Sequence, residues 1–374
     1  MNNPNLDITI GIVGGGQLGK MMAQSAKSSG YRVIILDPQK DCPASQVSDQ
    51  QLVAAYNDPV TLKELCQLST VITYEFENVD AETLKQLTNT SNFPQGVQVL
   101  EITQNRILEK NFLRSNGLPV GNYEPVYETS HLMPALEKIG YPAVLKTCRF
   151  GYDGKGQVIL KDSSHLPQAM ELVENSECIL EAWVPFSKEL SIMVSRNASG
   201  QLSLFPVSEN QHRDNILHLS IVPARISSNI EMRIQDLAKR IADKLDLVGT
   251  LGIELFLVEE ETIFINELAP RPHNSGHYSI EACNFSQFDT SIQAVLGLSM
   301  PNIQLLKSVI MVNVLGQDQE KVFELKTHKP NWHFHDYGKK EGKYNRKMGH
   351  ITILTDCIQT TLKEIDDTRI WRNN

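Results

Sequence analysis

The 374-residue sequence has no apolar run of about 20 residues, the length that a membrane-spanning helix needs. No basic segment precedes the apolar stretch near its start, so we expect no secretory signal, no membrane partner and a cytoplasmic protein. The six cysteines are scattered without a CxxC pair. This spacing argues against a disulfide framework or a zinc site and predicts reduced core thiols.

Basic residues are also scarce, since 35 Lys and Arg stand against 44 Asp and Glu, for a net charge of −9. Such a chain is a poor general binder of nucleic acid, and we expect no nucleic-acid partner. Any anionic ligand must then be held by a local basic cluster. The composition is that of an ordinary globular protein, and the length suggests two or three domains at about 100–200 residues each.

The first hundred residues alternate strand and helix patterns. Apolar runs at 8–13, 31–36 and 71–74 are separated by helical patterns, which favours a parallel sheet. We expect Thr103 to cap the next helix and Gly117 to end it.

After Pro119 the pattern changes. Leu190, Ile192 and Val194 alternate with polar or smaller residues, which predicts a half-buried antiparallel strand. Further strands are expected at 143–147, 158–160, 251–257, 309–315 and 351–354, and helices at 230–245 and 288–296.

Gly14-x-Gly16-x-x-Gly19 follows a strand and opens a helix, where backbone N–H groups can approach an anion. Asp37 ends the next strand, near the place of a ribose-binding acid. A dinucleotide site, another ligand on the same turn and a merely tight turn all remain possible.

The segment 151–157 carries three glycines between two strands, which indicates a flexible flap. It lacks the GK[ST] ending of a P-loop. Lys155 adds charge to it, and Lys146 lies in the apolar strand before it, where a lysine needs a partner such as a nucleotide phosphate. A solvent-exposed hairpin loop is the alternative.

Two carboxylates can face each other across a hairpin. If Val258 lies opposite Ile263, then Glu254 lies opposite Glu267, and such a pair is unfavourable unless a cation or proton lies between. Phosphate-bound Mg²⁺ would explain it, and Asn266 suits the same ion. A register slip of one residue would separate the two carboxylates.

The loop 271–277 combines Arg271, His273, Asn274 and a second histidine between proline and glycine, which suits a small oxyanion better than a metal or a surface turn. The segment 339–347 holds five basic residues against one glutamate and is either a phosphate site or a solvated loop. Together these motifs indicate ATP-driven activation of an acid.

The chain resembles the 5-(carboxyamino)imidazole ribonucleotide synthases of the ATP-grasp superfamily. The resemblance rests on GIVGGGQLGKMM, VITYEFENVD, GYDGKGQ, EAWVPFSKELS, GIELF, INELAPRPHNSGHYSIEAC and RKMGHIT. It implies an α/β plus α+β, ATP-grasp architecture. The implied domains are a Rossmann-like domain at 1–105, a two-lobed ATP-grasp domain at 106–297 and a small C-terminal domain at 298–374.

The resemblance also implies a homodimer that carboxylates aminoimidazole ribonucleotide in purine biosynthesis, with ATP, bicarbonate and Mg²⁺ or Mn²⁺. ATP would contact Arg106, Lys146, Gly151, Tyr152, Asp153, Gly154, Lys155, Gly156, Gln157, Glu181, Ala182, Trp183, Val184, Glu189, His212, Asn266 and Glu267. Glu254 and Glu267 would hold the metal. Bicarbonate would meet Arg271, His273 and Asn274, with Asp153 or His273 as candidate proton acceptor. The ribonucleotide would lie near Gln17, Glu75, Asn78, Tyr152, Asp153, Lys339, Arg346 and Lys347.

One position departs from the family pattern, because Phe150 stands where the family usually has the first of two glycines before the flap tyrosine. Three other functions stay open. They are a related ATP-grasp enzyme that uses formate and glycinamide ribonucleotide, a nicotinamide dehydrogenase and a non-catalytic nucleotide sensor. YEFEN and RPHNSGH favour the carboxylating enzyme over the first, and the glutamate pair argues against the second.

Overall fold

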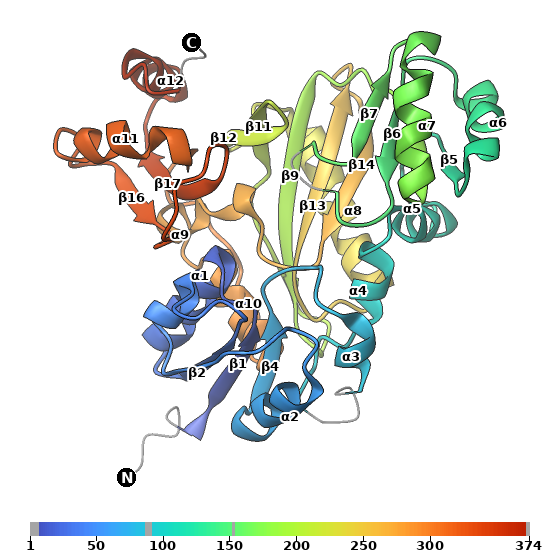
Figure 1. The fold of residues 1–374 in the computed structure, drawn as a ribbon. Helices are drawn as coiled ribbons and strands as arrows, with labels where there is room; N and C mark the ends of the chain where they lie inside the picture. The colour runs from blue at the N-terminus through green and yellow to red at the C-terminus, as the bar shows by residue number, and fades with distance from the viewer. Residues whose placement is uncertain (1–6, 87–91, 152–153, 372–374) are drawn as a thin grey trace.

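The computed structural model describes residues 7–86, 92–151 and 154–371, and its N-terminal part alternates strand and helix (Figure 1). The elements are β1 (Thr9–Val13), α1 (Gln17–Ser28), β2 (Arg32–Leu36), η2 (Pro43–Gln46), β3 (Gln50–Leu52), α2 (Pro59–Leu68), β4 (Val71–Tyr74), α3 (Ala81–Lys85) and α4 (Gln98–Thr103). The strands form a parallel sheet in the order β3-β2-β1-β4, which confirms the predicted parallel sheet. Helices cover both of its faces, so β1 and β4 are apolar and buried almost throughout.

Helix α5 (Arg106–Ser115) connects this part to the rest of the chain, and its predicted cap was wrong. Asn105 caps the helix, because its side-chain oxygen accepts the N–H of Ile107 at 2.9 Å. Thr103 instead ends α4, where its hydroxyl donates to the carbonyl of Val99 at 2.8 Å and is not available as a cap. Gly117 has φ 65° and follows the helix, as predicted.

A small lobe follows, drawn in green at the right of Figure 1. Its elements are β5 (Tyr123–Val126), α6 (Thr129–Ile139), β6 (Ala143–Thr147), β7 (Gln157–Leu160), η3 (Ser163–His165), α7 (Leu166–Asn175) and β8 (Cys178–Ala182). The strands pair antiparallel in the order β5-β8-β6-β7, and α6 and α7 cover one face of that sheet.

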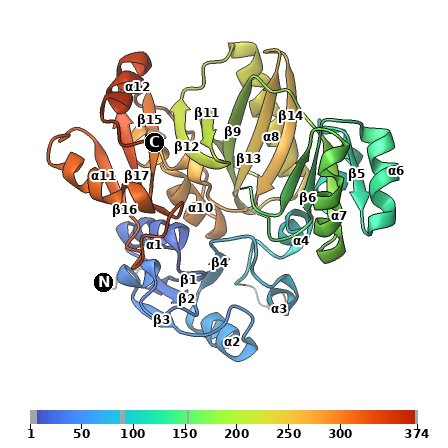
Figure 2. The same cartoon turned by 45° about the horizontal axis from the view of Figure 1, so that its top comes forward.

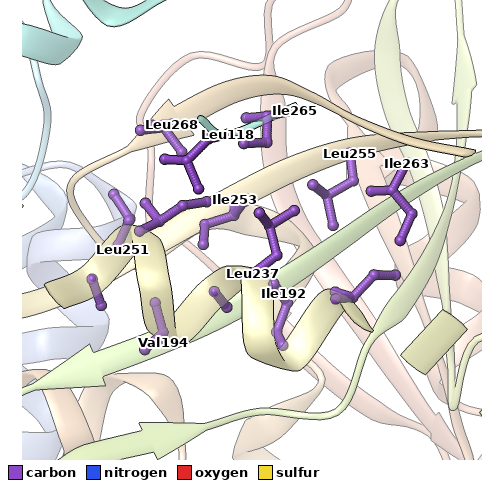
Figure 3. Packing of buried hydrophobic residues seen from close by; sticks show 14 of the residues in the cluster. Leu118, Ile192, Val194, Leu237, Leu251, Ile253, Leu255, Ile263, Ile265 and Leu268 are labelled. Carbon is purple, nitrogen blue, oxygen red and sulfur yellow. The ribbon is translucent and has the colours of Figure 1, made fainter. Parts of the chain in front are cut away.

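The large lobe is built on a central sheet. Its elements are β9 (Lys188–Arg196), β10 (Leu202–Leu204), β11 (Ser208–Arg213), β12 (Ile216–Val222), α8 (Ser228–Lys244), β13 (Gly249–Val258), β14 (Thr262–Ala269), η4 (Asn274–Gly276), α9 (Ser279–Ala282) and α10 (Gln287–Val295). The apolar stripe of α8 packs on the inward side chains of β9, β13 and β14 (Figure 3). Helix α10 packs between the N-terminal part and the central sheet (Figure 2).

Strand β9 is antiparallel to its neighbours as predicted, but it is not half-buried. Its residues from Leu190 to Ser195 are all buried, because α8 covers one face and α10 and η4 cover the other. The polar members are accommodated by hydrogen bonds between hydroxyl groups. Ser191 contacts Ser275 at 2.6 Å, and Ser195 contacts Thr250 at 2.7 Å.

The C-terminal part continues the same sheet. Its elements are β15 (Val309–Leu315), η5 (Gly316–Asp318), α11 (Gln319–Lys326), β16 (His333–Asp336), β17 (Lys347–Leu354) and α12 (Ile358–Asp367). The strand order is β14-β13-β9-β11-β12-β15-β17-β16, so β12 and β15 join the large lobe to the C-terminal part. The domain boundaries at 105/106 and 297/298 stay predictions.

All six cysteines are free thiols, and the expectation of core thiols holds for Cys42, Cys148, Cys178 and Cys283, which are buried. It was wrong for Cys357, which is exposed, and Cys66 is only partly buried. Within the described residues, no helix is long and apolar enough to cross a bilayer.

Candidate active site

The glycine turn at 14–19 is already filled by two carboxylates of the chain. Glu75, at the end of β4, accepts the N–H groups of Gly16 and Gly19, the latter at 2.6 Å. Asp37 accepts the N–H of Gly15 at 2.7 Å and the hydroxyl of Tyr56 at 2.7 Å. Because these carboxylates take the place that a pyrophosphate would need, the turn does not form the predicted alternative, a dinucleotide site.

Glu254 and Glu267 lie opposite each other on β13 and β14, as predicted, although the predicted register was wrong at the turn. Leu257, not Val258, pairs with Ile263, so the slip of one residue does occur there. A β-bulge at Asn266 then shifts the register by one residue, and this shift brings the two glutamates opposite each other.

Each glutamate of this pair contacts a cationic or polar group. Glu267 accepts from Arg106 at 2.8 Å, while Glu254 lies 3.3 Å from both the Nε2 atom of His273 and the amide of Asn266. Burial, followed by the charge of Glu267, raises the pKa of Glu254. Two facing carboxylates, of which Glu267 disfavours the charge of Glu254, fit a divalent cation such as Mg²⁺. Within the described residues, no group of three or more His, Cys, Asp or Glu side chains is arranged to hold a metal ion.

Glu181 on β8, one of the predicted ATP residues, lies between two lysines. Lys146 donates to its carboxylate at 2.8 Å, and Lys110 lies 3.9 Å from the other oxygen. Burial opposes the charge, but these two lysines lower the pKa of Glu181 to about 2. Lys146 therefore has a protein partner before any phosphate is bound. Of the segment that follows, Trp183 is exposed, and Ala182 and Val184 are partly buried.

The flap at 151–157 belongs to the small lobe and reaches the turn between β11 and β12 of the large lobe. A Cβ atom on Gly154, whose φ is 79°, would come within 2.6 Å of the Asn215 side chain in the turn after β11. Gly151, Lys155, Gly156 and Gln157 lie along the flap, and the carbonyl of Gly156 accepts the N–H of Thr147 at 2.8 Å. Tyr152 and Asp153 lie outside the described residues.

Phe150 has φ 62° and is 72% exposed. The bulky residue therefore adopts the left-handed conformation that glycine favours. On the large lobe, Glu189 forms an ion pair with His212, and this carboxylate raises the pKa of His212 although burial opposes it.

The loop 271–277 is tied to the N-terminal part. Arg271 donates two hydrogen bonds to Glu77, one of them at 2.9 Å, and the guanidinium lowers the pKa of that carboxyl to about 2 despite its burial. His273 contacts the hydroxyl of Ser275 at 2.9 Å through Nδ1. Burial and then the charge of Arg271 lower the pKa of His273 to about 3, so this imidazole is neutral at pH 7.

Asn274 is placed differently from its neighbours. Its amide exchanges two hydrogen bonds with Asn313 on β15, at 3.0 and 2.7 Å, and it is buried. The side chain thus holds the loop against the C-terminal part and does not point freely toward a ligand.

The basic segment reaches the N-terminal part. Lys339 donates to the side chain of Gln17 and to the carbonyl of Lys347 at 2.7 Å, and its charge acts on Glu75. Lys347 acts electrostatically on both His212 and His273, so the segment lies beside the other site residues. Arg346 is partly exposed and donates to the carbonyl of Glu341, and Asn78 is exposed.

Sequence reasoning missed Glu77, Glu109, Lys110 and Ser275. Glu77 stood within YEFEN, and the unmatched charge of Arg271 was a signal that an acid should face it. Lys110 stood among Ile107 and Leu113 on the buried stripe of α5, where a lysine needs partners. A cavity of about 520 Å³ between β12, β15 and Trp371 contains none of the predicted site residues.

Family models match almost the whole chain. A ribonucleotide synthetase preATP-grasp domain matches residues 8–104, an ATP-grasp domain matches 111–288, and a phosphoribosylaminoimidazole carboxylase C-terminal domain matches 309–364.

Known proteins match at similar length. The N5-carboxyaminoimidazole ribonucleotide synthase of Bacillus subtilis is 48% identical over 364 residues, 97% of this chain and 95% of that protein. An ADP complex of an N5-carboxyaminoimidazole ribonucleotide synthetase superimposes with a TM-score of 0.95 at 47% identity, covering 99% of each chain. The Aspergillus clavatus synthase, in complex with ADP and 5-aminoimidazole ribonucleotide, has a TM-score of 0.91 at 31% identity over 98% of each chain.

The predicted ATP-grasp architecture is confirmed by these matches and by the sheets described above. The relatives also argue against the formate-using enzyme and the dehydrogenase. The chain belongs to the N5-carboxyaminoimidazole ribonucleotide synthases of the ATP-grasp superfamily.

Proposed function

We propose that the protein uses ATP and bicarbonate to carboxylate the amine of 5-aminoimidazole ribonucleotide, with release of ADP and phosphate. The observation that carries this proposal is the Glu77–Arg271 pair, which brings YEFEN and RPHNSGH together beside Glu254 and Glu267. A family member whose structure holds ADP and 5-aminoimidazole ribonucleotide supports the choice of substrates.

In the proposed reaction, a bicarbonate oxygen attacks the γ-phosphorus of ATP, and ADP leaves. Arg106, Lys146 and the flap at 151–157 would hold the triphosphate. Mg²⁺, or Mn²⁺ in its place, would be held by Glu254 and Glu267 and would neutralise charge on the transferred phosphoryl group. Arg271 would hold bicarbonate and then carboxyphosphate by its fixed charge.

The amine of the ribonucleotide then attacks the carbon of carboxyphosphate, or of CO₂ released from it, and phosphate leaves. The amine must lose a proton in this step. The candidate acceptors are Asp153 and His273, of which His273 is neutral but only weakly basic at a pKa of about 3. Gln17, Glu75, Lys339, Arg346 and Lys347 would hold the ribonucleotide, and flap closure would exclude water from the intermediate.

The decisive experiment measures ADP release and incorporation of ¹⁴C-bicarbonate into an acid-labile carbamate. We expect incorporation only when ATP, Mg²⁺ and aminoimidazole ribonucleotide are all present. Incorporation of labelled formate into glycinamide ribonucleotide would overturn the assignment. We further propose that the enzyme is a cytoplasmic homodimer, which sedimentation equilibrium and cell fractionation would test.

A further inference from the structure

Helix α5 places two charged side chains against the bulge of β14. Glu109 and Lys110 share one helix face with Arg106, three or four residues before them. Lys110 donates from Nζ to the carbonyls of Ile265 and Asn266, at 3.2 and 2.8 Å. The neighbouring Glu109 accepts a hydrogen bond of 3.2 Å from the backbone N–H of Leu268. The two side chains therefore bind the backbone on both sides of Glu267.

These two residues are unusually buried for their type. Lys110 is 4% exposed and Glu109 is 2% exposed. Burial lowers the pKa of Lys110, and burial followed by the charge of Glu267 raises the pKa of Glu109 to about 8. Charged groups in such a position destabilise a protein unless they are matched. Since an apolar side chain could fill this space, the contacts with β14 need an explanation beyond packing.

The bulge supplies that explanation. A bulge leaves backbone groups of the strand out of the regular ladder. β14 is the last strand in the sheet order, and on its outer side the segment at Pro119 and Val120 pairs with Ile265, just before the bulge. Helix α5 covers this edge and takes up the displaced carbonyl and N–H groups.

The position of the bulge decides where Glu267 points. A regular ladder continued from the Leu255–Ile265 pair would place Asn266 opposite Glu254. Glu267 would then lie opposite Ile253, whose side chain is in the core (Figure 3). With the bulge, Glu267 faces Glu254 and Leu268 takes the core position.

We propose that Glu109 and Lys110 are positioning residues that hold the bulge at Asn266, keep Glu267 opposite Glu254 and so set the affinity of the site for Mg²⁺. The inference rests on the metal role proposed above for the two glutamates. Glu109 and Lys110 act through the backbone of β14 and are not themselves ligands.

The first test is Lys110→Met, which keeps the length of the side chain and removes the donors. Calorimetric titration of Mg²⁺ into the ADP complex should show at least a tenfold loss of Mg²⁺ affinity. Because Lys110 also lies 3.9 Å from Glu181, an expected ATP residue, the metal-free ADP affinity in EDTA is compared in Glu109→Leu, where it should stay within threefold of the wild-type value. Lys138→Met is the matched control, because Lys138 is an exposed lysine of the small lobe that pairs with Glu124. The Mg²⁺ affinity of this variant should not change.

The second test compares two changes of Glu109 and remains decisive if Lys110→Met fails to fold. Glu109→Gln keeps an oxygen for the N–H of Leu268, so Mg²⁺ affinity should stay within twofold. Glu109→Leu removes that acceptor and should lower Mg²⁺ affinity at least fivefold.

Three results would overturn the inference. Wild-type Mg²⁺ affinity in both Lys110→Met and Glu109→Leu would remove the positioning role while leaving the metal assignment intact. An equal loss of metal-free ADP affinity in Glu109→Leu would show that these residues act through the arrangement of the lobes. A wild-type ADP complex that binds no Mg²⁺ would overturn the metal assignment and this inference together.

Discussion

Arg271 donates hydrogen bonds from two guanidinium nitrogens to the carboxylate of Glu77, and this pair joins the end of β4 to the loop after β14. The first prediction is that Glu77→Gln, which leaves Arg271 without its counter-charge, lowers kcat/KM for bicarbonate. Loss of a charged hydrogen bond of about 1.5–3 kcal/mol corresponds to about 10–150-fold. Steady-state kinetics at saturating ATP would measure it, with the exposed Glu82→Gln as control. A change within twofold would contradict a role for the pair in bicarbonate binding.

The second prediction concerns Glu254 and Glu267. Glu254→Gln and Glu267→Gln should each lower kcat by about 10²–10³-fold, the scale of losing one electrostatic contact to a transition state. Because Glu267 and burial disfavour the charge of Glu254, the metal-free Glu254→Gln protein should melt no lower than wild type. Kinetics at several Mg²⁺ concentrations and thermal melting in EDTA test both parts, and near-normal kcat in both variants would refute the metal role.

The third prediction concerns Phe150, whose φ is 62°. In this left-handed conformation a non-glycine residue destabilises the folded protein by about 1–2 kcal/mol. Glycine avoids that cost, but it lowers stability by about 0.5–1 kcal/mol relative to alanine because it loses more conformational entropy on folding. Phe150→Gly should therefore be at least as stable as Phe150→Ala, the reverse of the usual order, and the KM for ATP should change because the flap is altered. Denaturant titrations and ATP kinetics decide this. An alanine variant more stable than the glycine variant would show that the backbone is not strained here.

The fourth prediction concerns the basic segment. Arg346→Ala should raise the KM for the ribonucleotide by about 10–150-fold, because a phosphate contact of about 1.5–3 kcal/mol is lost. The KM for ATP should barely move. Lys343→Met is the control, since this lysine is exposed and pairs with Glu341 within the segment. If Arg346→Ala and Lys347→Ala both kept the ribonucleotide KM within twofold, the segment would be a solvated loop.

The fifth prediction concerns acid stability. Burial, and then the charge of Arg213, lower the pKa of His218 to about 3, below the ordinary value near 6.5. Below pH 6.5 the unfolded chain binds a proton at His218 that the folded protein does not bind. The free energy of unfolding therefore falls as the pH falls below 6.5. Between pH 7 and pH 5 this one histidine lowers the free energy of unfolding by about 2 kcal/mol. His218→Gln should lose less stability over that range in urea titrations. The exposed His131→Gln should behave as wild type, and equal losses in all three proteins would contradict the assignment.

The parallel sheet, the flap and the main strands could be predicted because periodicity and glycine spacing are local signals. Glu254 and Glu267 were also paired correctly, but through a register that fails at the turn. The sequence does contain the missing signal. Ile263 and Ile265 are two residues apart, whereas the next core residue, Leu268, comes three later, and this break in the period of two indicates a bulge.

Other features depended on contacts between distant segments. The burial of β9 on both faces follows from α10 and η4, which lie many residues away and whose docking no local pattern reveals. Glu77 was missed for the same reason, since its partner Arg271 is 194 positions distant. Thr103 was mistaken for a cap because the local sequence does not distinguish a threonine at the start of a helix from one at its end. In the structure the Thr103 hydroxyl donates a hydrogen bond to the carbonyl of Val99.

The pairing of β12 with β15 limits how members of this family can be cut and recombined. A fragment ending near residue 298 would leave β12, buried along its whole length, with an open edge, and such edges promote aggregation. The same cut would remove Asn313 from the loop that carries Arg271 and His273. Chimeric enzymes should therefore exchange the large lobe and the C-terminal part as one piece and place their junctions before β9.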